Sequence, residues 1–420
     1  MRHLYTLLVR LAVPFATLLV LWRGLRRGDY WRGGSARFGL GAAATAPGGI
    51  WVHAVSVGEV QAAAVLIEAL RAREPQVCIT LTCATPTARA RARALLAPEV
   101  DVRFGPYDLP GAVRRTLARL RPALLIIIET ELWPNLLHEC TRQRVPILLA
   151  SARVSARTER CYRRLPGLLR PALAGNVWVA AQTEPDAARL CALGVPAERA
   201  RVVGNIKFDR QLPPQLAERG ARLRARYAGY RPLWVAGSTH PIEERLVLDA
   251  HQLLRAQSAD AVLVLAPRHR ERFDAVAALL AERRWTYVRR SADDANGNAA
   301  VLLLDSLGEL MDFYAAADAA FVGGSLVAVG GHNLLEPAAL GLPVLSGPHQ
   351  FNAPDIARLL TAEGGLTIVH NAAELAQSLI ELFADESVRQ RKGTAARAVV
   401  EANRGAIERV LALVSELRPA

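Results

Sequence analysis

Short apolar runs alternate with helical stretches along most of this chain. In the first half, such runs lie at residues 50–55, 77–82, 124–128, 145–149 and 177–181. In the second half they lie at residues 233–236, 262–266, 300–304, 319–322 and 343–345. The clearest helical stretch between them is 60–73. Strands that alternate with helices predict a parallel sheet with helices covering both faces.

A polar stretch rich in Pro and Arg, residues 210–231, interrupts this alternation. We interpret it as a linker between two similar doubly wound domains at 28–209 and 232–400, followed by a C-terminal helix at 401–420. The predicted fold is α/β, with two Rossmann-like domains facing a cleft. Ligands of such sheets bind at the carboxyl ends of the strands.

The N-terminus differs from the rest of the chain. Residues 4–22 are almost wholly apolar but are interrupted by Arg10, and an arginine-rich flank with Tyr30 and Trp31 follows. A spanning helix needs about 20 apolar residues, and no small-residue cleavage site follows the apolar core. We expect residues 1–27 to form an uncleaved hydrophobic anchor helix, interfacial or marginally spanning, with its basic flank on the cytoplasmic side. The alternative is a buried core helix.

Composition narrows the function classes. The 420 residues carry a formal charge of +13, to which Arg contributes most because Lys207 and Lys392 are the only lysines. No RNA-binding aromatic motif, zinc finger or basic zipper accompanies this charge, so we expect no nucleic-acid partner. The five cysteines form no CxxC pair, which favours a reducing compartment and disfavours disulfides and zinc.

A glycine-rich segment, residues 323–349, predicts a nucleotide site. Two glycine pairs follow the apolar run 319–322, and His332-Asn333 then lead into the expected helix start at Leu334-Leu335-Glu336. Glycines allow close approach of backbone to a ligand, and helix-start amides favour an anion. The spacing matches neither a P-loop nor GxGxxG.

Carboxylates follow two strands of the first half. Glu59 starts a helix in HAVSVGEV, where it is either a general base or a helix-capping residue. Glu129 and Glu131 follow the apolar run 124–128 in ETELWPN. On an extended chain these two share a side, and pairing with arginine is the alternative for one of them. Glu59 and Glu129 resemble the opposed carboxylates found around an oxocarbenium-like sugar centre.

Basic and hydroxyl groups follow other strands. Lys207 lies in GNIKFD, where a compact ammonium suits a point contact to phosphate. Ser238, Thr239 and His240 follow one strand, and Arg268-His269 follow the next, which predicts an anion pocket. A helical segment at 306–314 contains Gly308 and Glu309, which are expected to border a base or ribose.

Taken together, HAVSVGE, ETELWPN, SARVSAR, GNIKFD, AGSTH, APRH, GELMDFY, GGHNLLEP and GPHQFN resemble the motifs of the bacterial 3-deoxy-D-manno-octulosonic acid (Kdo) transferases, nearly end to end. The resemblance implies a GT-B fold and inverting, metal-independent transfer of Kdo from CMP-Kdo to a lipid A precursor (lipid IVA). It also implies that no cofactor is used and that the enzyme works on the cytoplasmic side of the inner membrane. Domain 28–209 would bind the acceptor, and domain 232–400 the CMP-Kdo.

The same resemblance implies roles for individual residues. Glu59 matches the proton acceptor, and Glu129 and Lys207 match the transition-state stabilisers. The positions that match CMP contacts are Pro267, Arg268, Leu307, Gly308, Glu309, Asn333, Leu334, Leu335 and Glu336. His332 and Glu336 have i, i+4 spacing, but no further ligand is evident and no metal site is predicted.

Three questions stay open at this stage. A nucleotide-sugar 2-epimerase or UDP-sugar transferase would share the two domains and the carboxylates, and a membrane-bound nucleotide-sugar sensor would share the binding residues. The basic run from Arg153 to Arg164 faces either lipid phosphates or solvent. Neither the number of Kdo units transferred nor the oligomeric state follows from the sequence.

Overall fold

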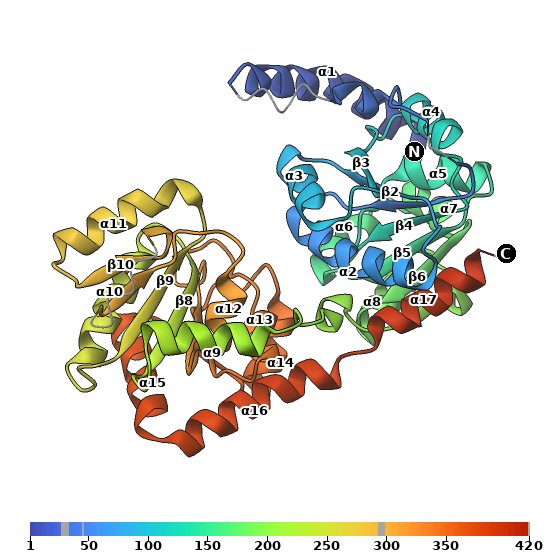
Figure 1. The fold of residues 1–420 in the computed structure, drawn as a ribbon. Helices are drawn as coiled ribbons and strands as arrows, with labels where there is room; N and C mark the ends of the chain where they lie inside the picture. Colours follow the sequence, from blue (N-terminus) through green and yellow to red (C-terminus); the bar gives the residue numbers. More distant parts are fainter. Residues whose placement is uncertain (27–32, 44–45, 293–298, 419–420) are drawn as a thin grey trace. The chain divides into compact units, whose positions relative to one another are not determined.

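The computed structural model describes residues 1–26, 33–43, 46–292 and 299–418 (Figure 1). The chain forms two compact units. The first contains Met1–Arg210 together with Asn403–Ala420, and the second contains Gln211–Ala402. In the described residues each unit is built on a seven-stranded parallel sheet.

The sheet of the first unit has the order β3-β2-β1-β4-β5-β6-β7. Its strands are β1 (Ile50–His53), β2 (Ile79–Cys83), β3 (Asp101–Phe104), β4 (Leu124–Ile128), β5 (Ile147–Ala152), β6 (Val177–Ala181) and β7 (Ala200–Val202). Its helices are α1 (Arg2–Arg26), α2 (Val57–Arg73), α3 (Pro86–Leu95), α4 (Pro110–Leu120), α5 (Pro134–Arg142), α6 (Ala156–Arg163), α7 (Pro166–Leu173), α8 (Glu184–Leu193) and α17 (Ala406–Leu417).

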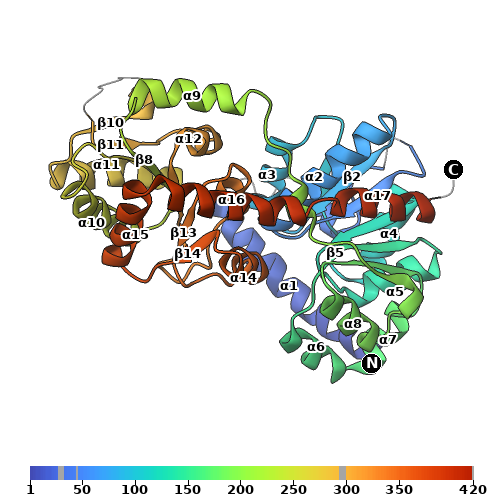
Figure 2. The same cartoon turned by 90° about the horizontal axis from the view of Figure 1, so that it is seen from below.

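Alternate side chains of the central strands enter two different cores. Val52 and Ile126 pack with residues of α2, α3 and α17, whereas Trp51 and Leu125 pack with residues of α4, α5, α7 and α8. The helices therefore cover both faces of the sheet, as Figures 1 and 2 show for α2 and α5. Burial on both faces is the reason that these strands read as continuous apolar runs.

The sheet of the second unit has the order β10-β11-β9-β8-β12-β13-β14. Its strands are β8 (Leu233–Thr239), β9 (Val262–Pro267), β10 (Tyr287–Arg289), β11 (Val301–Leu303), β12 (Ala319–Val322), β13 (Val344–Ser346) and β14 (Leu366–Ile368). Its helices are α9 (Leu216–Tyr227), α10 (Glu243–Arg255), α11 (Phe273–Glu282), α12 (Leu310–Ala316), α13 (Leu335–Ala339), α14 (Pro354–Ala362), α15 (Ala372–Ala384) and α16 (Glu386–Ala402).

The second unit repeats the layered arrangement. Trp234 and Leu263 pack with residues of α10, α11 and α15 on one face, and Val235 and Val264 pack with residues of α9 and α12 on the other. The prediction of two doubly wound parallel α/β units is confirmed. Each of the ten predicted apolar runs contains or overlaps a strand, and the helix predicted at 60–73 begins three residues earlier, at Val57.

The predicted linker contains a helix, and the predicted C-terminal helix belongs to the first unit. The interval 210–231 contains α9, which packs on α12 within the second unit. The terminal helix α17 belongs to the first unit, where the Asp209 carboxylate accepts hydrogen bonds from the backbone N–H groups of Gly405 (2.5 Å) and Ile407 (2.6 Å). Asp209 thus caps a helix that lies almost 200 residues further along the chain.

Helix α1 is anchored to the first unit by polar contacts near its start. The Tyr5 hydroxyl donates to Asp108 Oδ2 (2.9 Å), and Thr6 Oγ1 donates to Asn135 Oδ1 (3.0 Å). Asp108 in turn accepts from the backbone N–H groups of Asn135 and Leu136. In the described residues no helix combines the length and the apolar character needed to cross a bilayer. The residues Arg27, Tyr30, Trp31 and Arg32 of the basic flank lie outside the described residues.

Candidate active-site residues in the two units

Glu59 lies in the first turn of α2 and is 8% exposed. Its carboxylate accepts hydrogen bonds from the Val55 N–H (2.8 Å), the Ser56 N–H (3.3 Å) and the Ser56 hydroxyl (2.6 Å). Ser56 Oγ in turn accepts from the Glu59 N–H, which completes a capping box. Helix capping, which the sequence left as an alternative, is therefore present, and these bonds satisfy a nearly buried carboxylate.

Glu129 follows β4 with a backbone φ of 57°, in the left-handed region. Its Oε1 lies 2.6 Å from Lys207 Nζ, and its Oε2 lies 3.7 Å from Arg153. The extended backbone that would put Glu129 and Glu131 on one side is therefore absent, because the chain turns at Glu129 itself. A non-glycine residue in this region costs about 1–3 kcal/mol, and such strain concentrates at functional sites.

Lys207 is the second residue of a short 3₁₀ helix, η4 (Ile206–Asp209). The Asn205 side chain accepts from the Lys207 N–H (3.0 Å) and donates to Gln182 Oε1 (3.2 Å). Ile206 and Phe208 are buried on either side in sequence. Buried neighbours and a capped start fix the backbone, so the ammonium reaches Glu129 from a defined position.

Glu131 is bonded to a different partner. The Trp133 indole N–H donates to its Oε2 (2.8 Å). Burial raises the pKa of the Glu131 carboxyl, and the negative charges of Glu59 and Glu129 raise it further, against the opposing effect of the Trp133 hydrogen bond. Glu59, Glu129 and Glu131 therefore share one electrostatic environment, although no described hydrogen bond joins Glu59 to Glu129 or Lys207.

His53 packs against Trp133, the residue that donates a hydrogen bond to Glu131. Its ring is edge-on to Trp133, with centroids 4.7 Å apart, and its Nδ1 lies 2.8 Å from Thr82 Oγ1. The Nε2 atom is buried without a hydrogen-bond partner. Complete burial lowers the pKa of His53 to about 4, so the ring is neutral at physiological pH.

In the second unit, a buried carboxylate shapes the glycine-rich loop. Glu243 is 0% exposed and accepts from the backbone N–H groups of Gly324 (2.7 Å), Ser325 (3.1 Å) and Leu326 (3.0 Å). It also accepts from the N–H of His240 (3.2 Å). Four amides thus converge on one side chain, which ties the end of β8 to the loop after β12.

The GPHQFN segment supports the same loop from the other side. The Asn352 amide donates to the carbonyl oxygens of Val329 (3.2 Å) and Gly331 (3.0 Å). Gly330 and Gly331 have φ values of 107° and 75°, and a Cβ at either position would overlap Phe351 or Gln350. Both glycines are required by backbone conformation and by close approach.

The remaining positions predicted to contact CMP lie on loops of the second unit. Pro267 is buried and pairs in register with Thr239, whereas Arg268 is exposed. The Glu309 carboxylate is paired with Arg290 (2.8 Å) and accepts from the Ser306 hydroxyl. Gly308 has a φ of 94°, and Leu307 is 69% exposed.

The helix expected from Leu334 begins at Leu335 and is only five residues long. Asn333 is exposed, and its Oδ1 accepts from the Leu335 N–H (3.1 Å). Leu334 and Leu335 are buried, and Glu336 lies in the first turn. A helix of five residues has a small macrodipole. Its start therefore attracts an anion less strongly than the sequence analysis assumed.

Comparisons with known proteins identify the family. Residues 32–210 match the family model described as 3-Deoxy-D-manno-octulosonic-acid transferase (kdotransferase), and residues 234–399 match Glycosyl transferases group 1. A 3-deoxy-D-manno-octulosonic acid transferase from Haemophilus influenzae is 38% identical over 417 residues, and one from Bordetella pertussis is 41% identical over 424 residues. Each alignment covers 98% of this chain and 98% of the relative. The chain belongs to the Kdo transferase family.

The solved structures that resemble this Kdo transferase family member share its fold. The UDP-GlcNAc 2-epimerase from Neisseria meningitidis has a TM-score of 0.59 at 12% identity, covering 87% of this chain and 99% of its own. A putative UDP-N-acetylglucosamine 2-epimerase from Listeria monocytogenes has a TM-score of 0.58 at 16% identity, covering 88% and 96%. These likenesses support the GT-B architecture. The full-length relatives, at much higher identity, decide between the transferase and the epimerase considered from the sequence.

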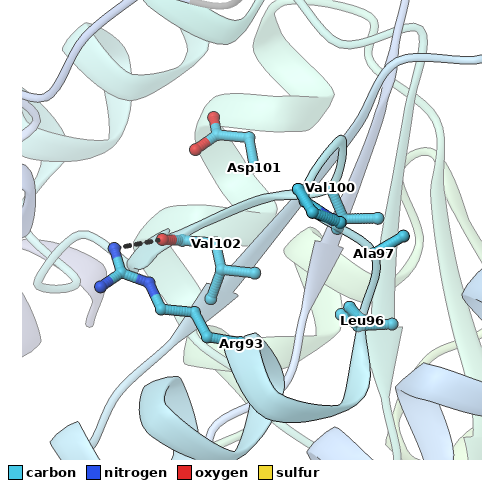
Figure 3. A pocket seen from close by; sticks show the side chains of 7 residues that line it. Arg93, Leu96, Ala97, Val100, Asp101 and Val102 are labelled. Carbon is cyan, nitrogen blue, oxygen red and sulfur yellow. Dashed lines mark hydrogen bonds between the residues drawn. The ribbon is translucent and has the colours of Figure 1, made fainter.

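A surface pocket of the first unit lies apart from all the predicted site residues. It is lined by residues of α3, of β3 and of the loop between them, among them Leu96, Val100 and Val102, and Arg93 donates to the Val102 carbonyl (Figure 3). None of the Kdo transferase motifs contributes to it, so we assign it no role.

Sequence reasoning named the following residues but missed two contacts that they make. Arg153 was grouped with a basic run, but it precedes α6 and contacts Glu129, and its N–H donates to Thr130 Oγ1 (3.1 Å). Within the run itself, Arg163 pairs with Glu159 (3.6 Å). The second contact is that between His240 and His332, whose Nε2 atoms are 2.8 Å apart. Both histidines lie in motifs already quoted, but their contact depends on strand order.

Proposed function

We propose that this protein transfers Kdo from CMP-Kdo to a lipid A precursor, lipid IVA, with inversion and without a metal ion. The observation that carries this proposal is the environment of Glu129. This residue has a strained backbone and is paired with Lys207 at 2.6 Å, and its charge, like that of Glu59, raises the pKa of Glu131. Strained backbone, carboxylates and an ammonium together are typical of a site that stabilises separated charge.

In the proposed reaction, a hydroxyl of the acceptor attacks C2 of Kdo while Glu59 accepts its proton. The bond between C2 and the phosphate oxygen breaks, and CMP leaves with the electron pair. Glu129 stabilises the positive charge that develops at C2, Lys207 is the second transition-state stabiliser, and Arg268 in the second unit offsets the phosphate charge. A single displacement of this kind inverts the anomeric centre.

The capping box is compatible with a base at Glu59. A capping interaction places the carboxylate at the helix start without using all of its oxygen lone pairs, because an ionised carboxylate has about four acceptor positions. Three hydrogen bonds are donated to it. The same contacts hold its orientation, and a fixed general base is more effective than one that must first be ordered.

We also propose that α1 binds the inner membrane on its cytoplasmic side as an interfacial helix. Among the side chains of α1 that the structure describes, the large exposed apolar ones are Leu4, Leu7, Leu8, Leu11, Phe15 and Leu18, each at least 51% exposed. At 3.6 residues per turn these six positions fall within an arc of about 100°. Tyr5 and Thr6 contact the protein instead. Transfer of each apolar side chain to lipid contributes roughly 1 kcal/mol, which together suffices for reversible binding.

The decisive experiment is transfer from CMP-Kdo generated in situ to a tetraacylated lipid A precursor. We expect product with wild type and near-total loss in Glu59→Gln. The matched control is Glu68→Gln on the same helix, because Glu68 is exposed. Absence of product from a wild-type enzyme that binds CMP would refute the acceptor assignment, and full activity in Glu59→Gln would refute its role as base.

Vesicle flotation tests the membrane proposal independently. Wild type should float with vesicles of anionic and zwitterionic phospholipid, and the double variant Leu7→Asn/Leu11→Asn should remain in the soluble fraction. If both proteins float equally, α1 does not mediate binding.

A further inference from the structure

Three histidines converge at the carboxyl ends of the central strands in the second unit. His240 follows β8, His269 follows β9, and His332 lies in the loop after β12. The planes of the His240 and His332 rings are 6° from parallel, their centroids are 5.1 Å apart and their Nε2 atoms are 2.8 Å apart, so the rings lie edge to edge with these nitrogens facing each other. His269 lies edge-on to His240, with centroids 5.3 Å apart.

The backbone at Gly324 packs closely against the pair of His240 and His332. Gly324 packs against both rings, and a Cβ there would lie 2.9 Å from His332 and 3.4 Å from His240. Glu243 accepts hydrogen bonds from the backbone N–H groups of Gly324 and His240, so one buried carboxylate positions both. The contact between the two rings therefore depends on the packing of Gly324 against them and on the hydrogen bonds that Glu243 accepts.

The distance between the Nε2 atoms limits the number of protons on the pair. At 2.8 Å one Nε2 carries a proton and donates it, and the other accepts. If both nitrogens carried protons, two N–H groups would point at each other, and the hydrogen bond would be lost. A second proton is tolerated only when an acceptor, such as an anion, enters between or beside the two rings.

Burial and the neighbouring positive charge keep the unliganded pair neutral. Burial lowers the pKa of His332 to about 3, and the positive charge of Arg268 and the rings of His240 and His269 lower it further. Burial also lowers the pKa of His240, as do His269 and Arg268, and Glu244 opposes this shift. Glu244 is itself paired with Arg272 (3.0 Å), and Glu243 is occupied by backbone amides. An added dianion would reverse this balance, because it favours the charged imidazole.

We propose that the pair of His240 and His332 is a phosphate subsite that takes up one proton when a nucleotide monophosphate binds. The inference rests on the proposed function, in which the second unit binds the CMP portion of the donor. The proton comes from solvent, the hydrogen bond between the rings breaks, and each Nε2–H donates to phosphate oxygen. During transfer, the same proton offsets the charge left on the phosphate when the C2–O bond breaks.

The test is calorimetric titration of the full chain with CMP at pH 8, in buffers of different ionisation enthalpy. Free CMP is almost entirely dianionic at this pH, because its second phosphate pKa is about 6. We expect uptake of about one proton per CMP, and an affinity that falls about tenfold per pH unit above pH 8. His332→Gln and His240→Gln should each abolish the uptake. The matched control, His370→Gln, should retain it, because His370 is an exposed histidine of the same unit.

Two further titrations identify the group that is recognised. Cytidine should bind weakly without proton uptake, because it lacks the phosphate. Free Kdo carries a carboxylate and no phosphate, so proton uptake with Kdo and not with CMP would overturn the phosphate assignment.

The remaining outcomes separate this inference from the proposed function. If CMP binds to wild type without proton uptake, the histidine pair is not the proton acceptor, although the donor assignment stands. Uptake that persists in both histidine variants would also overturn the inference. If CMP does not bind to wild type at all, both proposals fail. The wild-type measurement alone decides the first and the last of these cases, even if a variant does not fold.

Discussion

The contact between Glu129 and Lys207 predicts a measurable coupling energy. Their charged atoms are 2.6 Å apart, and the side chains are 18% and 29% exposed. Two unit charges at this distance attract by about 6 kcal/mol at an effective dielectric constant of 20, and by about 1.6 kcal/mol in bulk water. Partial exposure, desolvation and loss of side-chain freedom reduce the net value. We expect a coupling of about 1–2 kcal/mol.

A double-mutant cycle with Glu129→Gln and Lys207→Met measures this coupling. Lys207→Met should cost more stability than Glu129→Gln, because it leaves a mostly buried carboxylate with only the weaker 3.7 Å contact to Arg153. Addition of Arg153→Met should then cost more in the Lys207→Met background than in wild type. The unfolding in urea is monitored by hydrogen exchange in peptides from β4 and β5. Because both strands belong to the first unit, this signal reports the stability of that unit alone.

The activity of the same variants tests the catalytic interpretation. Each single variant should bind CMP with near wild-type affinity and should lose about 10²–10³-fold in transfer rate. A coupling below about 0.3 kcal/mol would refute the ion pair in solution. Wild-type turnover in Lys207→Met would refute its role in catalysis even if the coupling were present.

Three other perturbations follow from the described contacts. Ser56→Ala removes the hydroxyl from the capping box of α2 and should cost about 1 kcal/mol in urea unfolding, while it lowers the transfer rate by loosening Glu59. Asp209→Ala uncaps α17 and should cost about 1–2 kcal/mol, with increased hydrogen exchange in that helix and unchanged CMP affinity. His53 has a folded-state pKa of about 4, below the unfolded value of 6.5, so its contribution to stability is complete above pH 6.5 and declines as pH falls towards 4. Between pH 7 and pH 5, wild type should lose about 2 kcal/mol more than His53→Gln.

The sequence predicted the central strands of both sheets and missed all four edge strands. β3, β7, β10 and β14 are the outermost strands, and in each at least half of the residues are not buried. Their patterns are less continuously apolar because only one neighbouring strand and part of one face cover them. Apolar runs are therefore a reliable signal for the middle of a doubly wound sheet and a weak one for its edges.

The site was predictable as a set of residues but not as a set of contacts. Glu129 was singled out because it follows an apolar run, and Lys207 because it is one of only two lysines in an arginine-rich chain, and the structure pairs them. The left-handed backbone at Glu129 left no signal, because a glutamate in that conformation is required by tertiary packing and not by local propensity. For the same reason, the contact between His240 and His332, 92 residues apart, depends on β8 and β12 being neighbours.

For Glu59 the sequence offered two alternatives, helix capping and catalysis, which do not exclude each other. The structure contains the complete capping box, but in a helix whose start follows a central strand at the edge of the sheet where Glu129 and Glu131 also lie. A capping carboxylate is held at a helix start by short hydrogen bonds, and the carboxyl end of a parallel strand directs that helix start towards a ligand site. The interactions that stabilise α2 are therefore the same ones that orient the proposed base, so loss of the Ser56 hydroxyl should reduce stability and turnover together.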